Sequence, residues 1–272
     1  MSGRLPLCGP LLWDRHYEGK PMAELSPYYQ DEHTTLYCEE VFDILPELPV
    51  LDAIITDPPY SSGGQMKNDR ARAVSAKYSS AKKEARPDFT GDSRDQRSYL
   101  VWSTLWMTAA YHAARDKANL LVFTDWRQLP TITDAVQAAG WLWQGVQVWH
   151  KTTSRPRPNA FRADSEFVVW ATKGPLDTNK DGAVYLPGVH KGSPPSGKNR
   201  VHTTQKSVEV MEWLCSIIPE ENSLICDPLM GSGTTLVAAR NLGHRCIGVD
   251  LSEQFCDFTI DRLKEQEEGQ HD

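Results

Sequence analysis

Short apolar runs alternate with amphipathic segments over most of the chain. Residues 53–56 are almost wholly apolar, which is typical of a strand in a parallel sheet covered on both faces. Strands are predicted in this way at 34–38, 53–56, 119–125, 141–151, 165–174, 222–227 and 245–250. Helices are predicted at 98–116, 129–140, 203–218, 234–243 and 253–266, the third with Val208, Met211, Leu214 and Cys215 on one face. This alternation predicts an α/β fold with a doubly wound, mostly parallel sheet.

Three stretches interrupt the pattern. Residues 1–33 show no clear periodicity and are interpreted as an N-terminal arm, which leaves 34–272 as the main domain. Residues 61–98 are polar and nearly free of large apolar side chains, so a functional or mobile loop is predicted there. Residues 174–203 form a second polar stretch, rich in glycine and proline.

Charge is distributed unevenly along the 272 residues. The net charge is -7, but residues 61–98 hold nine Lys/Arg against five Asp/Glu (+4), and residues 150–206 hold ten against four (+6). The rest of the chain therefore carries -7 - 4 - 6 = -17. Two basic segments on an acidic body are what a protein that grips phosphates with selected loops would show, although solvated basic loops would look the same.

The composition also bears on the cellular compartment in which the protein is found. No run of about 18 apolar residues is present, and residues 1–10 lack the pattern of a signal peptide, so no membrane partner is expected. The six cysteines are scattered without metal-ligand spacing and are expected to be reduced thiols, with no metal site. A cytoplasmic protein is predicted.

A strand, a glycine turn, a helix and a second strand follow one another in "LICDPLMGSGTTLVAARNLGHRCIGVDLS", residues 224–252. Gly231, Ser232 and Gly233 are small enough for a ligand to approach the backbone, and Asp250 is placed to accept hydrogen bonds from ribose hydroxyls. The unit therefore predicts an adenosine-type cofactor. A triphosphate loop would need a lysine after the turn, and a dinucleotide fingerprint usually has a third glycine. An ordinary turn that needs glycines is the remaining alternative.

The stretch "LDAIITDPPYSS", residues 51–62, ends an apolar strand with an aspartate, two prolines and a tyrosine. "DPLMGSGTT" resembles the motif of S-adenosylmethionine-dependent methyltransferases, which have a Rossmann-like fold and in which Asp227 would face the methionine portion of the cofactor. Together the two stretches resemble the amino-methylating DNA methyltransferases over most of residues 34–264. A strand-ending turn without function is the alternative for the Pro-Pro pair.

The resemblance implies roles for the residues of both motifs. Asp57 and the Pro58 carbonyl would accept the two N–H bonds of the target amine, and Pro58 and Pro59 would stiffen the backbone. Tyr60 would stack on a base swung out of the duplex, and no covalent intermediate would form. The cofactor residues implied are Asp57, Thr204, Lys206, Asp227, Pro228, Met230, Gly231, Ser232, Gly233, Thr234, Thr235 and Asp250.

The catalytic motif precedes the cofactor motif, which is similar to the β arrangement of this family, with a target-reading insert between them at about 174–203. Thr204 and Lys206 match its His-x-Thr-Gln-Lys-Pro segment, near the cofactor, although Lys206 could equally be a solvated residue at a helix start. The chain departs from the family at Leu229, Thr203 and Ser207, which leaves the cofactor contacts there in doubt. "FTDWRQLP" and "NAFRADSEFVVW" also resemble compact methyltransferases of phages and prophages, which implies a bacterial or phage-infected cell.

The partner that the resemblance implies is double-stranded DNA. Loop 61–98 follows Tyr60 and is placed to close over a flipped base. We expect phosphate contacts from Lys67, Arg70, Arg72, Lys77, Lys82, Lys83 and Arg86, and base contacts from Arg155, Arg157 and Arg162, each of which could instead be solvated. The insert is short, so a short recognition site or a second subunit, in a homodimer, is expected.

Several functions remain in competition. Adenine N6 is favoured over cytosine N4 because Asp-Pro-Pro-Tyr is commoner among the adenine enzymes. RNA or protein methyltransferases usually have the reverse motif order. A non-catalytic DNA-binding subunit would be expected to have lost Asp57, Tyr60 or the glycine turn, and a nicotinamide enzyme has no support beyond the shared βαβ unit.

Overall fold

One mixed sheet of nine strands runs through the part of the protein that the computed structural model describes, residues 25–61, 94–154, 156, 158–176, 183–194 and 206–268. The strand order is β1-β2-β9-β8-β3-β4-β6-β5-β7. The strands are β1 (Tyr29–Gln30), β2 (Thr34–Tyr37), β3 (Leu51–Thr56), β4 (Ala114–Thr124), β5 (Leu142–Lys151), β6 (Ser165–Thr172), β7 (Val189–Gly192), β8 (Leu224–Asp227) and β9 (Arg245–Val249). Five of the neighbouring pairs are parallel, and the pairs β1·β2, β4·β6 and β5·β6 are antiparallel.

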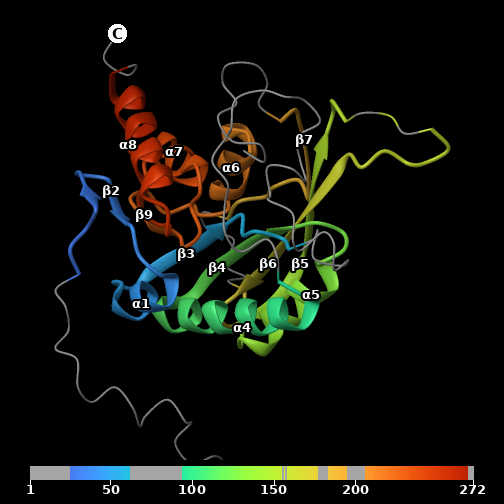
Figure 1. Ribbon diagram of the computed structural model, residues 1–272, viewed down its shortest axis with the longest axis horizontal. Coiled ribbons are helices and arrows are strands. Elements are labelled where there is room, and N and C mark those ends of the chain that lie inside the picture. Colours follow the sequence, from blue (N-terminus) through green and yellow to red (C-terminus); the bar gives the residue numbers. More distant parts are fainter. Residues whose placement is uncertain are drawn as a thin grey trace, which may run out of the picture.

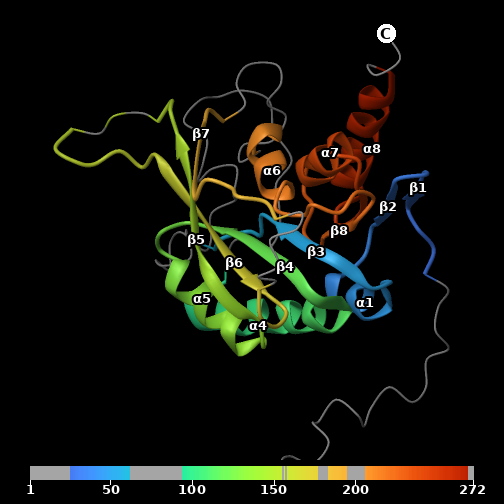
Figure 2. The ribbon, with the colours of Figure 1, turned by 180° about the vertical axis from the view of Figure 1, so that it is seen from behind.

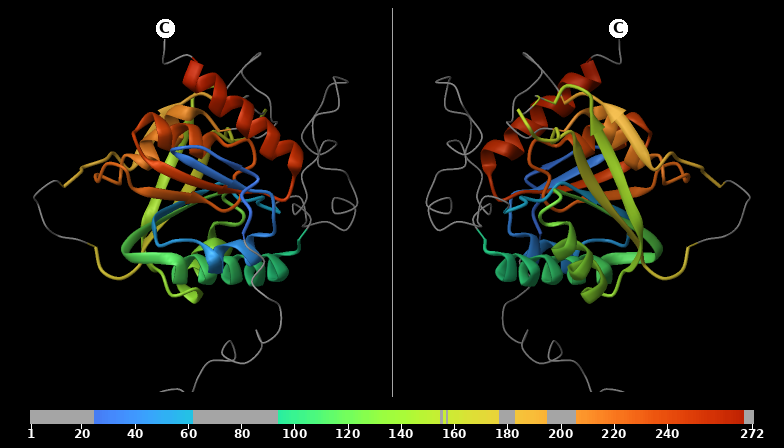
Figure 3. Two further views of the ribbon diagram at one scale, coloured as in Figure 1. Left: turned by 90° about the vertical axis from the view of Figure 1, so that its left-hand side faces the viewer. Right: turned by 90° about the vertical axis from the view of Figure 1, so that its right-hand side faces the viewer.

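Helices cover both faces of the sheet (Figures 1 and 2). One face carries α1 (Val41–Ile44), the short 3-10 helix η2 (Leu45–Glu47), α4 (Gln96–Ala113) and α5 (Leu129–Ala138). The other face carries α6 (Val208–Cys215), α7 (Thr234–Asn241) and α8 (Glu253–Glu268). The side views in Figure 3 show α4 and α8 on opposite sides of the strands, so the doubly wound arrangement is confirmed.

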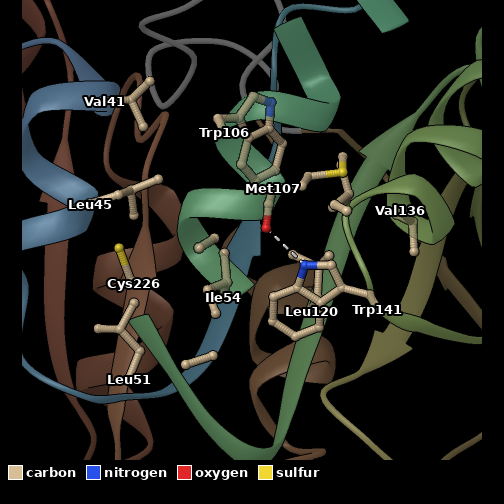
Figure 4. Close-up of a cluster of buried hydrophobic side chains, with 14 of the residues drawn as sticks. Val41, Leu45, Leu51, Ile54, Trp106, Met107, Leu120, Val136, Trp141 and Cys226 are labelled. Atoms are coloured by element: carbon tan, nitrogen blue, oxygen red, sulfur yellow. Dashed lines mark hydrogen bonds between the residues drawn. The ribbon is translucent and has the colours of Figure 1, made fainter. Parts of the chain in front are cut away.

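The core is divided by the sheet into two apolar clusters. Figure 4 shows the cluster under α4, where Trp106 and Met107 pack with Ile54 of β3 and Leu120 of β4. Trp141 is buried in it, and its indole N–H donates to the Met107 carbonyl at 2.9 Å. A buried indole with its one donor satisfied contributes apolar burial without an unpaired polar group.

Several boundaries differ from those predicted. Residues 29–30 form β1 on the sheet edge, so the arm expected at 1–33 is not wholly irregular. The helix expected to reach residue 116 ends at Ala113, because the chain enters the long strand β4 at Ala114. β7 lies within the polar stretch 174–203, where pairing with β5 rather than apolar periodicity makes the strand. Val208, expected on the buried face of its helix, is only half-buried in the first turn.

The middle of the sheet contains a topological switch point. From β3 the chain crosses by α4 to β4 on one side, and from β8 it crosses by α7 to β9 on the other side, while β3 and β8 are paired. In open α/β sheets ligands bind outside the carboxyl ends of the strands at such a point. β3 is followed there by Asp57, and β8 ends there at Asp227.

The cysteines and the possibility of a membrane-spanning helix can be examined throughout the described residues. Cys38, Cys215, Cys226, Cys246 and Cys256 are free thiols, whereas Cys8 lies outside the described residues. Within the same part of the chain, no helix is long and apolar enough to cross a membrane.

Candidate active site

The Asp-Pro-Pro-Tyr stretch leaves β3 at the switch point as an irregular segment with Pro58 buried and Asp57 half-buried. Both oxygens of the Asp57 carboxylate are engaged by side chains of the chain. Oδ1 accepts a hydrogen bond from the Tyr60 hydroxyl at 2.7 Å, and Oδ2 accepts one from Lys206 Nζ at 2.6 Å. The structure therefore brings three of the predicted site residues into direct contact.

Lys206 is a buried cation, with 4% of its side chain exposed. Its ammonium group also contacts Glu166 Oε2 and the Tyr60 hydroxyl, each at 3.1 Å, and lies 4.9 Å from the centre of the Phe123 ring. The alternative of a solvated residue at a helix start is wrong, because a lysine is buried in this way only when its charge is paired.

Glu166 joins the site from β6 and was missed in the sequence. Its Oε2 accepts from Tyr60 at 3.1 Å, and its Oε1 accepts from Lys151 Nζ of β5 at 2.9 Å. β6 runs antiparallel to β4, so its first residues lie at the edge where β3 and β4 end. The one signal in the sequence is an ionisable residue inside the predicted apolar strand 165–174.

Burial and charge shift the pKa of each member of this cluster. Burial, together with the nearby Glu166, raises the pKa of Asp57 despite the attraction of Lys206. Burial alone would raise the pKa of Glu166, but Lys206 and Lys151 outweigh it and hold that pKa at about 2. Burial opposes the charge of Lys206, yet Asp57 and Glu166 raise its pKa. Burial and both carboxylates raise the pKa of Tyr60. Glu166 and Lys206 are therefore charged at neutral pH.

The predicted cofactor turn lies between β8 and α7 at the same edge of the sheet. Gly231 (φ +49°) and Gly233 (φ +69°) both have the left-handed backbone that favours glycine. A Cβ at Gly231 would meet no atom within 4 Å, so the turn is open there. Asp250 follows β9 and accepts from the Gly231 amide at 3.0 Å and the Ser252 amide at 2.9 Å, and burial raises its pKa to about 6.

Asp227, which is expected to face the methionine portion of the cofactor, is buried at the end of β8. Its side chain points into the protein, where Oδ1 accepts from Thr56 Oγ1 at 2.7 Å and from the Leu229 amide at 3.1 Å, and Oδ2 accepts from Thr235 Oγ1 at 2.5 Å. Burial raises its pKa to about 7. Asp227 thus ties the end of β3 to the start of α7. The side chains of five other predicted cofactor residues are buried too: Pro228, Met230, Ser232, Thr234 and Thr235.

Helix α8 supports the glycine turn from behind, which the sequence did not reveal. Thr259 Oγ1 donates to the Gly231 carbonyl at 3.3 Å. Arg262 donates to the Ser232 carbonyl and, at 3.1 Å, to Thr234 Oγ1. A Cβ at Gly233 would lie 2.7 Å from Thr259 Oγ1, so this packing requires glycine as well.

The predicted DNA contacts are described only in part. Arg162 is exposed in the connection between β5 and β6, which extends away from the sheet (Figure 1). The remaining predicted residues lie outside the described ones: Thr204 of the cofactor set, and Lys67, Arg70, Arg72, Lys77, Lys82, Lys83, Arg86, Arg155 and Arg157 of the DNA set.

A doubly wound sheet with a glycine turn, an acidic strand end and a buried carboxylate at its switch point defines an α/β enzyme of the methyltransferase type. Residues 51–261 match the family model of the N6/N4 DNA methylases. Because this match spans most of the chain, the protein belongs to that family, and it is a DNA methyltransferase.

Similar proteins agree with this assignment. The type II methyltransferase M2.LlaDCHI of Lactococcus lactis subsp. cremoris is 26% identical over 262 residues, covering 87% of this chain and 91% of the relative. The putative methylase YubD of Escherichia coli K12 is 29% identical over 206 residues, covering 75% and 78%. The crystal structure of the M1.HpyAVI–SAM complex is 25% identical, with a TM-score of 0.62, and covers 85% of this chain and 98% of that one. The cytosine-N4-specific PvuII DNA methyltransferase (TM-score 0.66, 12% identity, 87% and 88% covered) shows the fold alone.

Proposed function

We propose that the protein transfers a methyl group from S-adenosylmethionine to the exocyclic N6 amine of an adenine that has been flipped out of double-stranded DNA. The observation that carries this proposal is the carboxylate of Asp57, half-buried at the carboxyl end of β3, at the same edge of the sheet as the open glycine turn. A charge held at that position is suited to an amine that becomes positive as it is methylated.

The residues at the edge of the sheet fit the cofactor. Asp250, half-buried at the end of β9, has lone pairs for ribose hydroxyls, and the turn at Gly231 leaves room for a ligand against its backbone. Because the side chains of Ser232, Thr234 and Thr235 are buried, contacts from this turn would come from backbone groups. When bound, the cofactor supplies a methyl group on a sulfonium centre, which is electrophilic.

The chain's own residues have to make the amine reactive, since its lone pair is delocalised into the ring. Asp57 would accept one N–H bond, and the Pro58 carbonyl would accept the other, which favours a tetrahedral nitrogen with a localised lone pair. The negative charge of Asp57 stabilises the cationic amine that forms, and the surplus proton leaves afterwards. Asp57 therefore acts by position and charge and does not need to be a strong base.

Adenine is preferred because Asp-Pro-Pro-Tyr resembles the adenine enzymes of the family. The family itself includes both N6 and N4 enzymes, and the two amines have similar needs for acceptors. We also propose that the substrate is double-stranded DNA, because two segments of the sequence are basic.

The decisive experiment transfers labelled methyl groups from S-adenosylmethionine to unmethylated double-stranded DNA, digests the DNA to nucleosides and analyses them by mass. N6-methyladenine is expected. N4-methylcytosine would keep the mechanism and overturn the choice of base. A protein that binds the cofactor and yet leaves DNA unmodified would overturn the proposed substrate.

The division of roles within the site is tested by two substitutions. We expect Asp57→Ala to abolish turnover but to spare cofactor affinity, measured by isothermal titration calorimetry, more than Asp250→Ala does. Asp134→Ala, an exposed position on α5, is the control for loss of an aspartate. Equal loss of cofactor affinity in the two site variants would contradict the division.

A further inference from the structure

The Tyr60 hydroxyl lies between two carboxylates. It is 2.7 Å from Asp57 Oδ1 and 3.1 Å from Glu166 Oε2, while Lys206 Nζ approaches it at 3.1 Å. A phenol has one proton to donate, so the hydroxyl can fully bond one carboxylate at a time. The shorter distance indicates that Asp57 accepts the hydrogen bond of this hydroxyl in the structure.

This arrangement conflicts with the binding of a target amine. Asp57 Oδ1 is occupied by Tyr60 and Oδ2 by Lys206, both donors of the chain itself. Each carboxylate oxygen can accept two hydrogen bonds, but an amine N–H that takes the lone pair of Oδ1 used by Tyr60 displaces its hydroxyl. A half-buried hydroxyl without an acceptor would oppose that exchange, because an unmade hydrogen bond is costly away from water.

We propose that Glu166 is a positioning residue that accepts the Tyr60 hydroxyl when the target amine takes its place on Asp57 Oδ1. The second acceptor is already within hydrogen-bond distance, so the exchange needs little movement of the phenol. The inference rests on the proposed function, since it assumes an amine at Asp57, and it adds a residue that lies outside the Asp-Pro-Pro-Tyr motif.

The ion pairs around Glu166 fit this role. Lys151 holds Oε1 at 2.9 Å and Lys206 holds Oε2 at 3.1 Å, so the carboxylate is fixed in place and remains an acceptor at neutral pH. The ammonium group of Lys206 also joins Glu166 to Asp57, and the two carboxylates and two ammonium groups balance in charge. A neutral side chain at position 166 would disturb both the acceptor and this balance.

Glu166→Gln is the first test, with exposed Glu47→Gln as the matched control. We expect the variant to lower kcat for methyl transfer roughly 10- to 100-fold, because the amide has one acceptor oxygen, for which the displaced hydroxyl and the two lysines then compete. The affinity for S-adenosylmethionine, measured by calorimetry, should stay within about twofold of the wild type. The control should leave both quantities unchanged.

A double-mutant cycle with Tyr60→Phe separates this role from a merely structural one. If Glu166 acts by receiving the hydroxyl, its replacement by Gln should cost much less in the Tyr60→Phe background, where no hydroxyl is present. Additive losses in kcat, with the same folded far-UV spectrum, would overturn the proposal. Glu166→Asp, which keeps the charge on a shorter side chain, should recover part of the loss.

The pH profile of kcat supplies an independent measurement. The titratable groups around the site are Asp57, Glu166, Lys151 and Lys206, together with Asp227 of β8, whose pKa is raised in part by Asp57. Removal of the Glu166 charge takes away one influence that raises the pKa of Asp57, so the acidic limb should move to lower pH in Glu166→Gln. An unmoved limb would contradict the inference. Absence of methylated DNA with the wild type would instead overturn the proposed function, and this inference with it.

Discussion

At the scale of single residues, Asp227 is the clearest case of a motif residue with a structural task. Its carboxylate collects donors from Thr56, Thr235 and the Leu229 amide, so it links the catalytic strand to the cofactor turn. Burial raises its pKa from 3.8 to about 7 in the folded protein. The folded state therefore holds a proton over a pH range in which the unfolded chain has released it.

The stability of the protein should depend on pH through this proton. Between about pH 4 and pH 7 the folded state binds it and the unfolded state does not, so stability falls as pH rises through that window and levels off above it. Asp227→Asn has no such proton. The free energy of unfolding of the wild type minus that of the variant, from urea titrations, should thus fall by up to about 1.4 kcal/mol per pH unit.

The difference between wild type and variant cancels the contributions of Asp57 and Asp250, whose pKa values are also raised and which both proteins contain. Asp134→Asn, at an exposed position, is the control: its free energy of unfolding plotted against pH should run parallel to that of the wild type. Parallel curves for Asp227→Asn would mean that Asp227 is ionised in the folded protein at acidic pH.

At the scale of elements, α8 is a brace for the glycine turn. Thr259 and Arg262, three residues apart on one face of the helix, bond the carbonyls of Gly231 and Ser232. Burial lowers the pKa of Arg262, because loss of water disfavours the charged guanidinium. The turn therefore keeps its shape through contacts with an element that follows it in the chain.

Loss of this brace should weaken cofactor binding. Arg262→Ala is expected to lower the free energy of unfolding by about 1–3 kcal/mol and the affinity for S-adenosylmethionine about tenfold, since the Ser232 carbonyl and the Thr234 hydroxyl lose their donor. Lys264→Ala, an exposed residue on the same helix, is the matched control. Unchanged affinity in a destabilised Arg262→Ala protein would show that the turn holds its shape without α8.

At the scale of the whole molecule, charge is distributed unevenly along the chain. The basic segments 61–98 and 150–206 carry +4 and +6, and each adjoins the catalytic edge in the sequence, at Tyr60 and at Lys206. The remaining -17 lies elsewhere in the chain. DNA should therefore be attracted to one part of an otherwise acidic protein.

The dependence of DNA binding on salt tests this distribution. Each phosphate contact that is lost makes the slope of log K against log [salt] less negative by about 0.9. Lys82→Ala combined with Lys83→Ala should change the slope by about one to two, measured by fluorescence anisotropy on duplex DNA. Lys264→Ala should leave it unchanged, and an equal change in the double variant and in Lys264→Ala would contradict local binding through loop 61–98.

The sequence by itself determined the features that depend on neighbouring residues. Apolar periodicity predicted the alternation of strands and helices, and the glycine turn with Asp250 was recognisable because strand, turn and helix are contiguous. Asp57 and Tyr60 were identified for the same reason. Which base is methylated and whether the protein forms a homodimer, or lies in the cytoplasm, stay predictions, as does the resemblance to phage enzymes.

Only the tertiary structure decided what surrounds those motifs. Glu166 is 106 residues from Tyr60, and Lys206 is 149 residues from Asp57, yet they share one buried cluster. The antiparallel return of β6 beside β4 places Glu166 at the catalytic edge, and the packing of α8 places Arg262 on the turn. Pairing between distant strands and burial of charge are properties of the assembled sheet, so local patterns of residues carry no record of them.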